Sequence, residues 1–325
     1  MIHCDNGPAE SEPLLERVQV AIYLAAITVG VAVGTVLPEL GPVLTTVLWP
    51  VLGLLLFVTF VQTPLNRLGT SLLDRRFVFA AVVGNFVLVP LLIWGLLHLA
   101  PTDPAIRLGV LLVLLVPCTD WFIPFARMGG GDAARAIAFT PLSLLLQLAL
   151  LPVYLQIFVG SRFDTAFVRA EMLVAFFGLI LLPLLLAFVT QEVKLGKWAD
   201  RLAQPVRMLP VPLLAFVVFL IAAAQSGRLI GRLGSVATVL LVFALYLVAA
   251  ALLAKLLASA LRLPATHARV LAFSFGTRNS FVVLPLALAL PSGWEMAALV
   301  IVLQSLVELI GMAAYVVIVP RILFR

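Results

Sequence analysis

The sequence is poor in charge and has no long polar stretch. Only 11% of the 325 residues are charged, whereas a soluble domain usually has about 25%. The longest polar connection, residues 192–207, is too short to form a domain. Because 63% of the residues are hydrophobic, the composition excludes an ordinary soluble enzyme. The lipid bilayer is the expected environment of most of the chain.

Cysteine and the common catalytic motifs are also scarce. Cys4 and Cys118 cannot form a disulfide framework or a multi-thiolate metal site. The sequence has no GxxxxGK[ST] phosphate loop, and His98 and His267 lack the HExxH pairing of zinc hydrolases. Its basic residues are spread over short loops, which argues against nucleic acid as a partner. We expect no cofactor and no enzymatic activity.

Apolar runs dominate what remains. A transmembrane helix needs about 20 apolar residues, and the chain has ten runs of suitable length. They are 18–37, 43–62, 77–100, 108–127, 137–159, 170–191, 208–226, 235–258, 269–290 and 296–318. The predicted fold is an all-α membrane protein with ten transmembrane helices.

The basic residues in the loops indicate the orientation. Fourteen Lys and Arg residues lie on the side of the N-terminal tail and five on the other, so both termini are expected in the cytoplasm of a bacterial-type cell membrane. The predicted parts are a tail at 1–17, a first repeat at 18–191 that runs into the sixth span, a cytoplasmic loop at 192–207, and the rest of a second repeat at 208–325.

The two halves resemble each other. Pro50 and Phe57 in the second span match Pro212 and Phe219 in the seventh at an offset of 162 residues. Five spans in each half is an odd number, so such repeats must be inverted. The fold expected from this pattern has two inverted five-helix repeats.

The fourth and ninth spans carry helix-breaking residues. The fourth reads VPCTDWFIP, with Pro117 and Pro124, and the ninth reads FGTRNSFVVLP, with Gly276 and Pro285. Proline removes a helix hydrogen bond, and the freed backbone groups need protein or a wet cavity beside them. Broken helices at equivalent places in inverted repeats mark the central site of carriers. We expect the two to meet at the membrane midplane.

Three ionisable residues are clear cases of charge placed deep in a span: Asp120, Arg278 and Glu308. Each costs about 2.5 to 3.5 kcal/mol to insert, so such groups normally face a cavity or a partner. Asp120 and Arg278 are expected to neutralise each other at the crossing, either in a transport site or only to pin the helices. The neighbouring polar residues expected to supply hydrogen bonds there are Thr119, Thr277, Asn279 and Ser280. Of these, Thr119, Asn279 and Ser280 are expected to bind substrate and Thr277 to act as a supporting polar group.

Glu308 is the candidate proton carrier. It follows Gln304 by four residues and therefore shares its helix face. A desolvated carboxyl group can keep its proton, which suits proton exchange; alternatively, Glu308 is a protonated group that only bonds to the opposite repeat. Gln304 and Asn85 are expected to act as supporting polar groups.

Cys118 has two interpretations. A buried cysteine generally behaves as a small apolar residue. Its position between Pro117 and Thr119, at the predicted break, favours a second interpretation in which its sulfur contacts a soft substrate such as trivalent arsenic or antimony. We expect no resident metal, only transient As(III) at Cys118.

Three segments carry a family resemblance: VPCTDWF at 116–122, GTRNSF at 276–281 and LQSLVEL at 303–309. With them the chain resembles the bile acid/sodium symporter superfamily and, within it, the arsenical-resistance carriers that export arsenite. The resemblance implies ten helices in two inverted repeats, with discontinuous fourth and ninth helices crossing between a core and a panel domain. It also implies roles in arsenite transport for Cys118 and Glu308.

The sequence departs from this family at several positions. Where sodium-coupled members bind sodium through a glutamate and a glutamine of the ninth helix, this chain has Ser274 and Arg278. The permanent charge of Arg278 could replace sodium there. Arsenite carriers also have a carboxylate shortly after the ninth-helix asparagine, whereas this chain has Val282 and Val283. Asp120 could compensate.

The leading hypothesis is a secondary carrier that exports arsenite, or a related trivalent metalloid, by proton antiport, with sodium the less expected ion. Cys118 would contact the metalloid, while Glu308, and with it Asp120, would exchange the proton. The alternative is a sodium- or proton-coupled carrier of organic anions, in which Arg278 would bind the substrate and Cys118 would be incidental.

Overall fold

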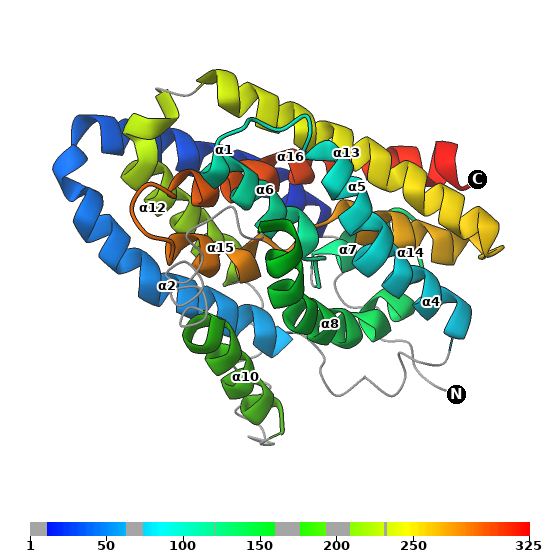
Figure 1. Ribbon diagram of the computed structural model, residues 1–325. Coiled ribbons are helices and arrows are strands. Elements are labelled where there is room, and N and C mark those ends of the chain that lie inside the picture. The colour runs from blue at the N-terminus through cyan, green and yellow to red at the C-terminus, as the bar shows by residue number, and fades with distance from the viewer. Residues whose placement is uncertain (1–11, 63–73, 120, 160–175, 193–208, 231–232) are drawn as a thin grey trace.

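The computed structural model describes residues 12–62, 74–119, 121–159, 176–192, 209–230 and 233–325 (Figure 1). These residues are predominantly helical. In chain order the elements are α1 (Glu12–Val36), η1 (Pro38–Leu40), α2 (Gly41–Gln62), α4 (Arg75–Val83), η3 (Gly84–Leu88), α5 (Val89–Leu96), α6 (Pro104–Leu115), α7 (Phe122–Met128), α8 (Ala133–Val159), η5 (Phe176–Leu181), α10 (Leu182–Glu192), α12 (Pro210–Ile230), α13 (Leu233–Ala260), α14 (Ala265–Gly276), α15 (Ser280–Leu288), α16 (Met296–Ile318) and η6 (Val319–Leu323).

Within the part of the chain that the structure describes, five helical segments are long and apolar enough to cross a membrane. They are Pro38–Gln62, Arg75–Leu96, Ala133–Phe158, Gly234–Ala260 and Met296–Leu323. Each of the ten predicted apolar runs overlaps at least one described helix. The third run was predicted to reach residue 100, but α5 ends at Leu96. Residues 1–11 of the predicted tail and 193–207 of the predicted loop lie outside the described residues.

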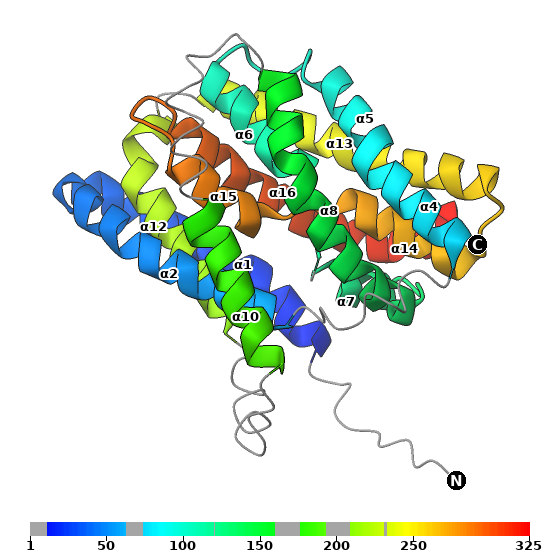
Figure 2. The same cartoon turned by 60° about the horizontal axis from the view of Figure 1, so that its bottom comes forward.

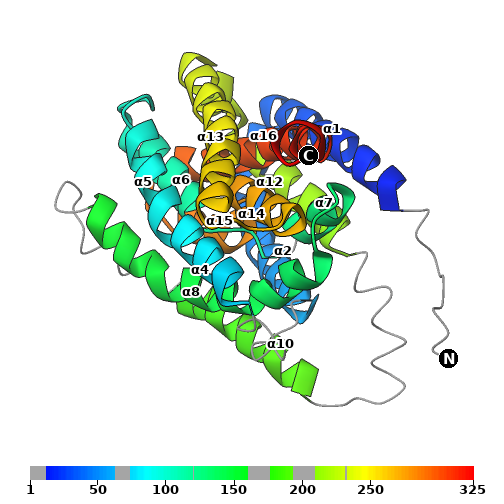
Figure 3. The same cartoon turned by 90° about the vertical axis from the view of Figure 1, so that its right-hand side faces the viewer.

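The helices form two groups. In the first, α1 packs along α12, and α2 packs against both α12 and α10. In the second, α4, η3 and α5 lie with α6, α8, α13 and α14, and α16 packs against α6 and α13 (Figure 2). Figure 3 shows α13 running lengthwise over the second group. The groups meet where α12 and α1 contact α16.

Two interrupted helices cross inside the molecule. Asp103 caps the start of α6 by accepting a hydrogen bond from the Ala105 amide at 2.9 Å, and α6 ends at Leu115, after which Val116 is extended. α14 ends at Gly276, after which Thr277 is extended. The extended segments bond antiparallel, with the Cys118 amide donating to the Thr277 carbonyl at 3.2 Å and the Asn279 amide to the Val116 carbonyl at 2.8 Å.

This pairing explains how the freed backbone groups are satisfied. Amides and carbonyls that would be hydrogen-bonded within a continuous helix bond to the opposite extended segment instead. Non-helical backbone at membrane depth requires such partners. Two of the prolines expected to break the helices do not: Pro124 lies within α7 and Pro285 within α15. The interruptions lie around Pro117 and after Gly276 instead.

A π-helical turn, η3, brings α4 and α5 close to the crossing. A Cβ at Gly84 would lie 1.9 Å from the Phe275 ring, so only glycine allows this approach. The hydroxyl of Tyr154 donates to the Phe86 carbonyl at 2.6 Å, which satisfies a group that the widened turn exposes. Asn85, between Gly84 and Phe86, is fully buried and faces the end of α14.

Candidate functional site

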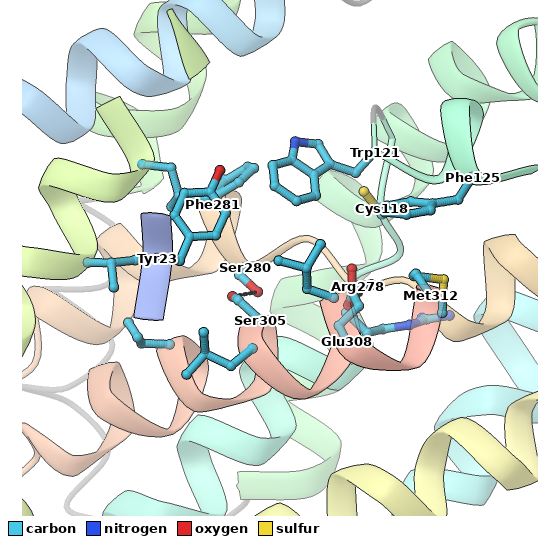
Figure 4. A pocket seen from close by; sticks show the side chains of 15 residues that line it. Tyr23, Cys118, Trp121, Phe125, Arg278, Ser280, Phe281, Ser305, Glu308 and Met312 are labelled. Atoms are coloured by element: carbon cyan, nitrogen blue, oxygen red, sulfur yellow. Dashed lines mark hydrogen bonds between the residues drawn. The ribbon is translucent and has the colours of Figure 1, made fainter. Parts of the chain in front are cut away.

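A small cavity lies between the two helix groups. Its volume is about 30 Å³. The wall consists of Tyr23 from α1, Leu214 and Val218 from α12, Cys118, Trp121, Phe125, Arg278, Ser280 and Phe281 from the two interrupted segments, and Val302, Ser305, Leu306, Glu308, Leu309 and Met312 from α16 (Figure 4). A single water needs about 10 to 15 Å³ of such space, so the cavity has room for a solute of only a few heavy atoms.

Cys118 reaches the cavity because the backbone is extended at the crossing. Its amide is held by the Thr277 carbonyl, and the residue is 4% exposed. Figure 4 shows its sulfur beside Phe125 and close to Trp121. The predicted soft-substrate residue therefore lies in a cavity wall together with a carboxyl group.

Glu308 is held by two donors on one oxygen. The Arg278 backbone amide donates to Oε2 at 2.7 Å and the Gln304 side-chain amide donates to Oε2 at 2.6 Å. The i, i+4 relation of Gln304 and Glu308 predicted from the sequence is confirmed by this second bond.

Two serine hydroxyls continue this network along the cavity. Ser305 donates to the Ser280 hydroxyl at 2.9 Å, and Ser280 donates to the side-chain oxygen Oε1 of Gln304 at 2.9 Å. The amide of Gln304 then donates to Glu308. The predicted substrate residue Ser280 is thus linked to the predicted proton carrier through Gln304, which itself is not part of the cavity wall.

The guanidinium of Arg278 is turned away from the cavity into a ring of uncharged oxygens. Nη1 donates to the Leu114 carbonyl at 3.3 Å. Nη2 lies 3.0 Å from Asn85 Oδ1, 3.0 Å from the Ser274 carbonyl and 2.6 Å from the Phe275 carbonyl. Three of these oxygens belong to the last turns of α6 and α14, where unpaired carbonyls carry the negative end of the helix dipole.

The oxygen ring is itself fixed in place. Asn85 donates to the Ser274 hydroxyl at 2.9 Å while its own oxygen accepts from Arg278. Tyr246 donates to the Phe275 carbonyl at 2.6 Å, and its ring lies 5.5 Å from the guanidinium carbon. Asn85 therefore supports Arg278 rather than the cavity wall. The predicted partner Asp120 lies outside the described residues, so the Asp120–Arg278 pair stays a prediction.

Three other predicted site residues support the crossing. The side-chain amide of Asn279 lies 3.4 Å from the Thr119 hydroxyl, and its oxygen caps α15 by accepting from the Val282 amide at 3.2 Å. Thr277 donates to the Phe273 carbonyl at 2.8 Å. None of the three is among the residues of the cavity wall, so the substrate contact predicted for Thr119 and Asn279 requires a cavity of different shape.

Sequence reasoning missed several cavity residues. Tyr23 stacks on Trp121 with ring centroids 6.2 Å apart, and Trp121 meets Phe281 edge to face at 5.9 Å. Met312 adds a second sulfur to the wall. Aromatic residues and methionine are common in apolar runs, so the sequence carries no signal that separates these from packing residues.

Two buried polar side chains of α8 lack hydrogen-bond partners. Neither side-chain polar atom of Gln147 has a partner among the described residues. The same holds for the hydroxyl of Ser143, one turn earlier. Both residues are 1% exposed or less.

A charged cluster joins the starts of α4, α8 and α14. Arg135 lies 2.7 Å from Asp74 and 3.0 Å from Asp132. His267, which lacks the HExxH pairing in the sequence, lies 3.5 Å from Asp74 and 3.9 Å from Asp132. Among the described residues, no group of three His, Cys, Asp or Glu side chains is placed to hold a metal ion.

His267 makes the stability of the folded protein sensitive to pH. Burial, and then the charge of Arg135, lower the pKa of His267 below its ordinary value of 6.5, while Asp74 and Asp132 oppose the change. The folded state binds the proton less strongly than the unfolded chain, so this stability is complete above pH 6.5 and is lost as the pH falls toward the folded pKa.

Between about pH 7 and pH 5, we expect the unfolding temperature of purified His267→Gln to decrease less than that of the wild type. His98→Gln is the matched control, because His98 is exposed and the described contacts of its ring, with the Trp94 and Gly95 carbonyls and the Trp94 ring, lie within its own turn. Equal pH dependence of the wild type and His267→Gln would contradict this assignment.

Comparison with known proteins places the chain in a family. Residues 49–232 match the model of the sodium bile acid symporter family, a stretch that covers more than half of the chain and includes the interruption between α6 and α7. A search of curated protein sequences found no match. Members of this family are transporters rather than enzymes. With at least five helices long and apolar enough to cross a membrane, the chain is a multi-pass membrane protein that belongs to the sodium bile acid symporter family.

Proposed function

We propose that the protein is a secondary carrier that exports arsenite, or a related trivalent metalloid, in exchange for protons. The observation that carries this proposal is one cavity, about 30 Å³ in volume, whose wall includes both the Cys118 thiol and the Glu308 carboxyl group. A soft donor and a proton-exchanging acid are the two groups that this reaction needs within reach of each other.

The size and charge of the cavity favour a small uncharged substrate. A steroid cannot enter a cavity of this volume without a large change in shape, whereas a metalloid centre with three hydroxyl groups is only four heavy atoms. The wall contains the hydroxyl residues Tyr23, Ser280 and Ser305 and the acidic Glu308. It also contains Arg278, but the Nη atoms of its guanidinium bond to oxygens that are not part of the wall. The hydroxyls and the carboxyl group suit the hydroxyls of a neutral solute better than an anion.

The metalloid would be recognised mainly by sulfur. Thiolate and thioether groups select soft centres, and Cys118 and Met312 supply one of each to the wall. A site with a single cysteine binds more weakly than the multi-thiolate sites that retain metals. Weak binding suits a carrier because the substrate must also be released on the other side.

Protons would drive the exchange through Glu308. The membrane potential contributes about 2.3 kcal/mol per charge for every 100 mV, so one inward proton per neutral substrate is sufficient to drive export. Asp120 is the second candidate for this step. Sodium is disfavoured because Arg278 already places a permanent cation among the carbonyl oxygens at the ends of α6 and α14.

The proposed architecture is the one expected from the sequence: ten spans in two inverted five-helix repeats, both termini in the cytoplasm, and a cytoplasmic loop at 192–207. The antiparallel pairing of Pro117 with Arg278 supports it, because one interrupted helix from each half takes part. The group of α1, α2, α10 and α12 would then be the panel that moves against the rest.

A carrier of organic anions is the second candidate. Arg278 is part of the cavity wall, and its Nε atom has no hydrogen-bond partner among the described residues. That nitrogen could bind a carboxylate or sulfonate after a rearrangement. The four oxygens around the other guanidinium nitrogens, and the acidic Glu308, weigh against this reading.

Arsenite uptake into everted membrane vesicles tests the proposal. We expect Cys118→Ala to lower the rate at limiting arsenite by at least about tenfold, the effect of losing about 1.4 kcal/mol of binding. Cys4→Ala, which changes the other cysteine, is the matched control and should transport normally. Taurocholate uptake that needs Arg278 but not Cys118 would instead support the second candidate.

A further inference from the structure

Tyr23 is the one tyrosine of the chain whose hydroxyl has no partner among the described residues. The chain has four tyrosines, and the other three donate to backbone carbonyls: Tyr154 to Phe86, Tyr246 to Phe275 and Tyr315 to Leu247. The Tyr23 hydroxyl is buried and bonds to no described residue. A buried hydroxyl without a partner destabilises a fold, so the presence of this one needs an explanation, and a function is the explanation argued below from its position.

The position of Tyr23 indicates what could satisfy this hydroxyl. Tyr23 is 4% exposed and is part of the cavity wall. Its ring is stacked on Trp121, with an angle of 25° between the ring planes, and Figure 4 shows it close to Phe281 at one side of the cavity. These two contacts restrict the movement of the ring, so the hydroxyl is held beside the cavity rather than free to seek another partner.

Tyr23 also belongs to a different helix group from the other polar residues that the wall contributes to this network. Ser280, Ser305 and Glu308 belong to the crossing and to α16. Among the described residues, the group of α1, α2, α10 and α12 contributes Tyr23, Leu214 and Val218 to the wall. Of these three, Tyr23 is the polar residue with which that helix group can bond to a solute in the cavity.

We propose that the Tyr23 hydroxyl donates a hydrogen bond to an oxygen of the bound substrate and so completes the site from the α1 side. The ligand class is a small solute with several hydroxyl groups around a soft centre, which rests on the proposed function. A substrate bonded to Tyr23 on one side and to Ser280 or Glu308 on the other connects the two helix groups. Occupancy of the cavity then changes how strongly the groups are held together.

The test compares two tyrosine-to-phenylalanine variants, each of which removes one buried hydroxyl. Tyr23→Phe removes an unpartnered group, so the unfolding temperature of the empty carrier should stay equal or rise, while the KM for arsenite in everted vesicles rises about tenfold. Tyr154→Phe removes a bonded group, so its unfolding temperature should fall while KM is unchanged. Stabilisation of the purified carrier by added arsenite should be lost in Tyr23→Phe alone.

The outcomes separate this inference from the proposed function. A wild type that transports arsenite beside a Tyr23→Phe variant with unchanged KM and unchanged stabilisation by arsenite would overturn the inference and leave the function standing. A wild type that neither transports arsenite nor is stabilised by it would overturn both. A lower unfolding temperature of empty Tyr23→Phe would show that the hydroxyl has a structural partner and would also overturn the inference.

Discussion

Glu308→Gln is expected to abolish arsenite accumulation driven by a pH gradient. Glutamine has the shape of glutamate, and its carbonyl oxygen can accept the same bonds from the Arg278 amide and the Gln304 side chain. The fold and the cavity are therefore preserved. A glutamine cannot exchange a proton near neutral pH, so gradient-driven uptake into everted vesicles should fall to the level of empty membranes, while exchange of labelled for unlabelled arsenite should continue.

The matched control is Glu295→Gln, just before α16, where the carboxylate accepts a bond from the Gly293 amide at 2.9 Å in an exposed turn. This variant should accumulate arsenite normally. If Glu308→Gln accumulates arsenite as the wild type does, then Glu308 is not the coupling group. Asp120 would then be the remaining acidic candidate in the predicted spans.

Arg278→Ala is expected to stop transport and to lower stability strongly. It leaves the oxygens of Leu114, Asn85, Ser274 and Phe275 without the guanidinium that they bind. A buried acceptor that is left without its donor costs about 1 to 3 kcal/mol. Because carbonyl oxygens at helix ends attract any cation, sodium or free guanidinium ions should partly restore the unfolding temperature of this variant.

The measurement is the unfolding temperature of the purified protein when sodium chloride or guanidinium chloride replaces choline chloride at equal, low concentration. The wild type should not respond specifically to sodium. Arg127→Ala is the control, because Arg127 is exposed at the end of α7. A wild type that sodium stabilises, or an Arg278→Ala variant as stable as the wild type, would refute the view that Arg278 acts as a built-in cation.

The sequence was most informative about local interruptions and about helix faces. The polar, proline- and glycine-containing segments around Cys118 and Arg278 predicted two broken helices that meet, and the structure pairs their backbones there. The spacing of Gln304 and Glu308 predicted a shared face, and the two side chains are hydrogen-bonded. Both features depend on the chain within a few residues, where helix geometry leaves few alternatives.

The partners of Arg278 could not be predicted in the same way. Charge alone suggested a carboxylate, whereas the described partners are an amide oxygen and three backbone carbonyls. Every residue has a carbonyl, so the sequence cannot indicate which ones converge. Their convergence depends on where α6 and α14 end and on the π-helical turn that brings Asn85 beside them.

The sequence by itself determined the membrane environment, the apolar runs and the two interrupted segments, because composition and local backbone chemistry decide these. Only the tertiary structure decided which side chains share the cavity. Tyr23 and Met312 are far apart in the sequence, yet both line it. An apolar run offers its side chains to lipid, to another helix or to a cavity with similar energy, so the packing of whole helices selects among these positions.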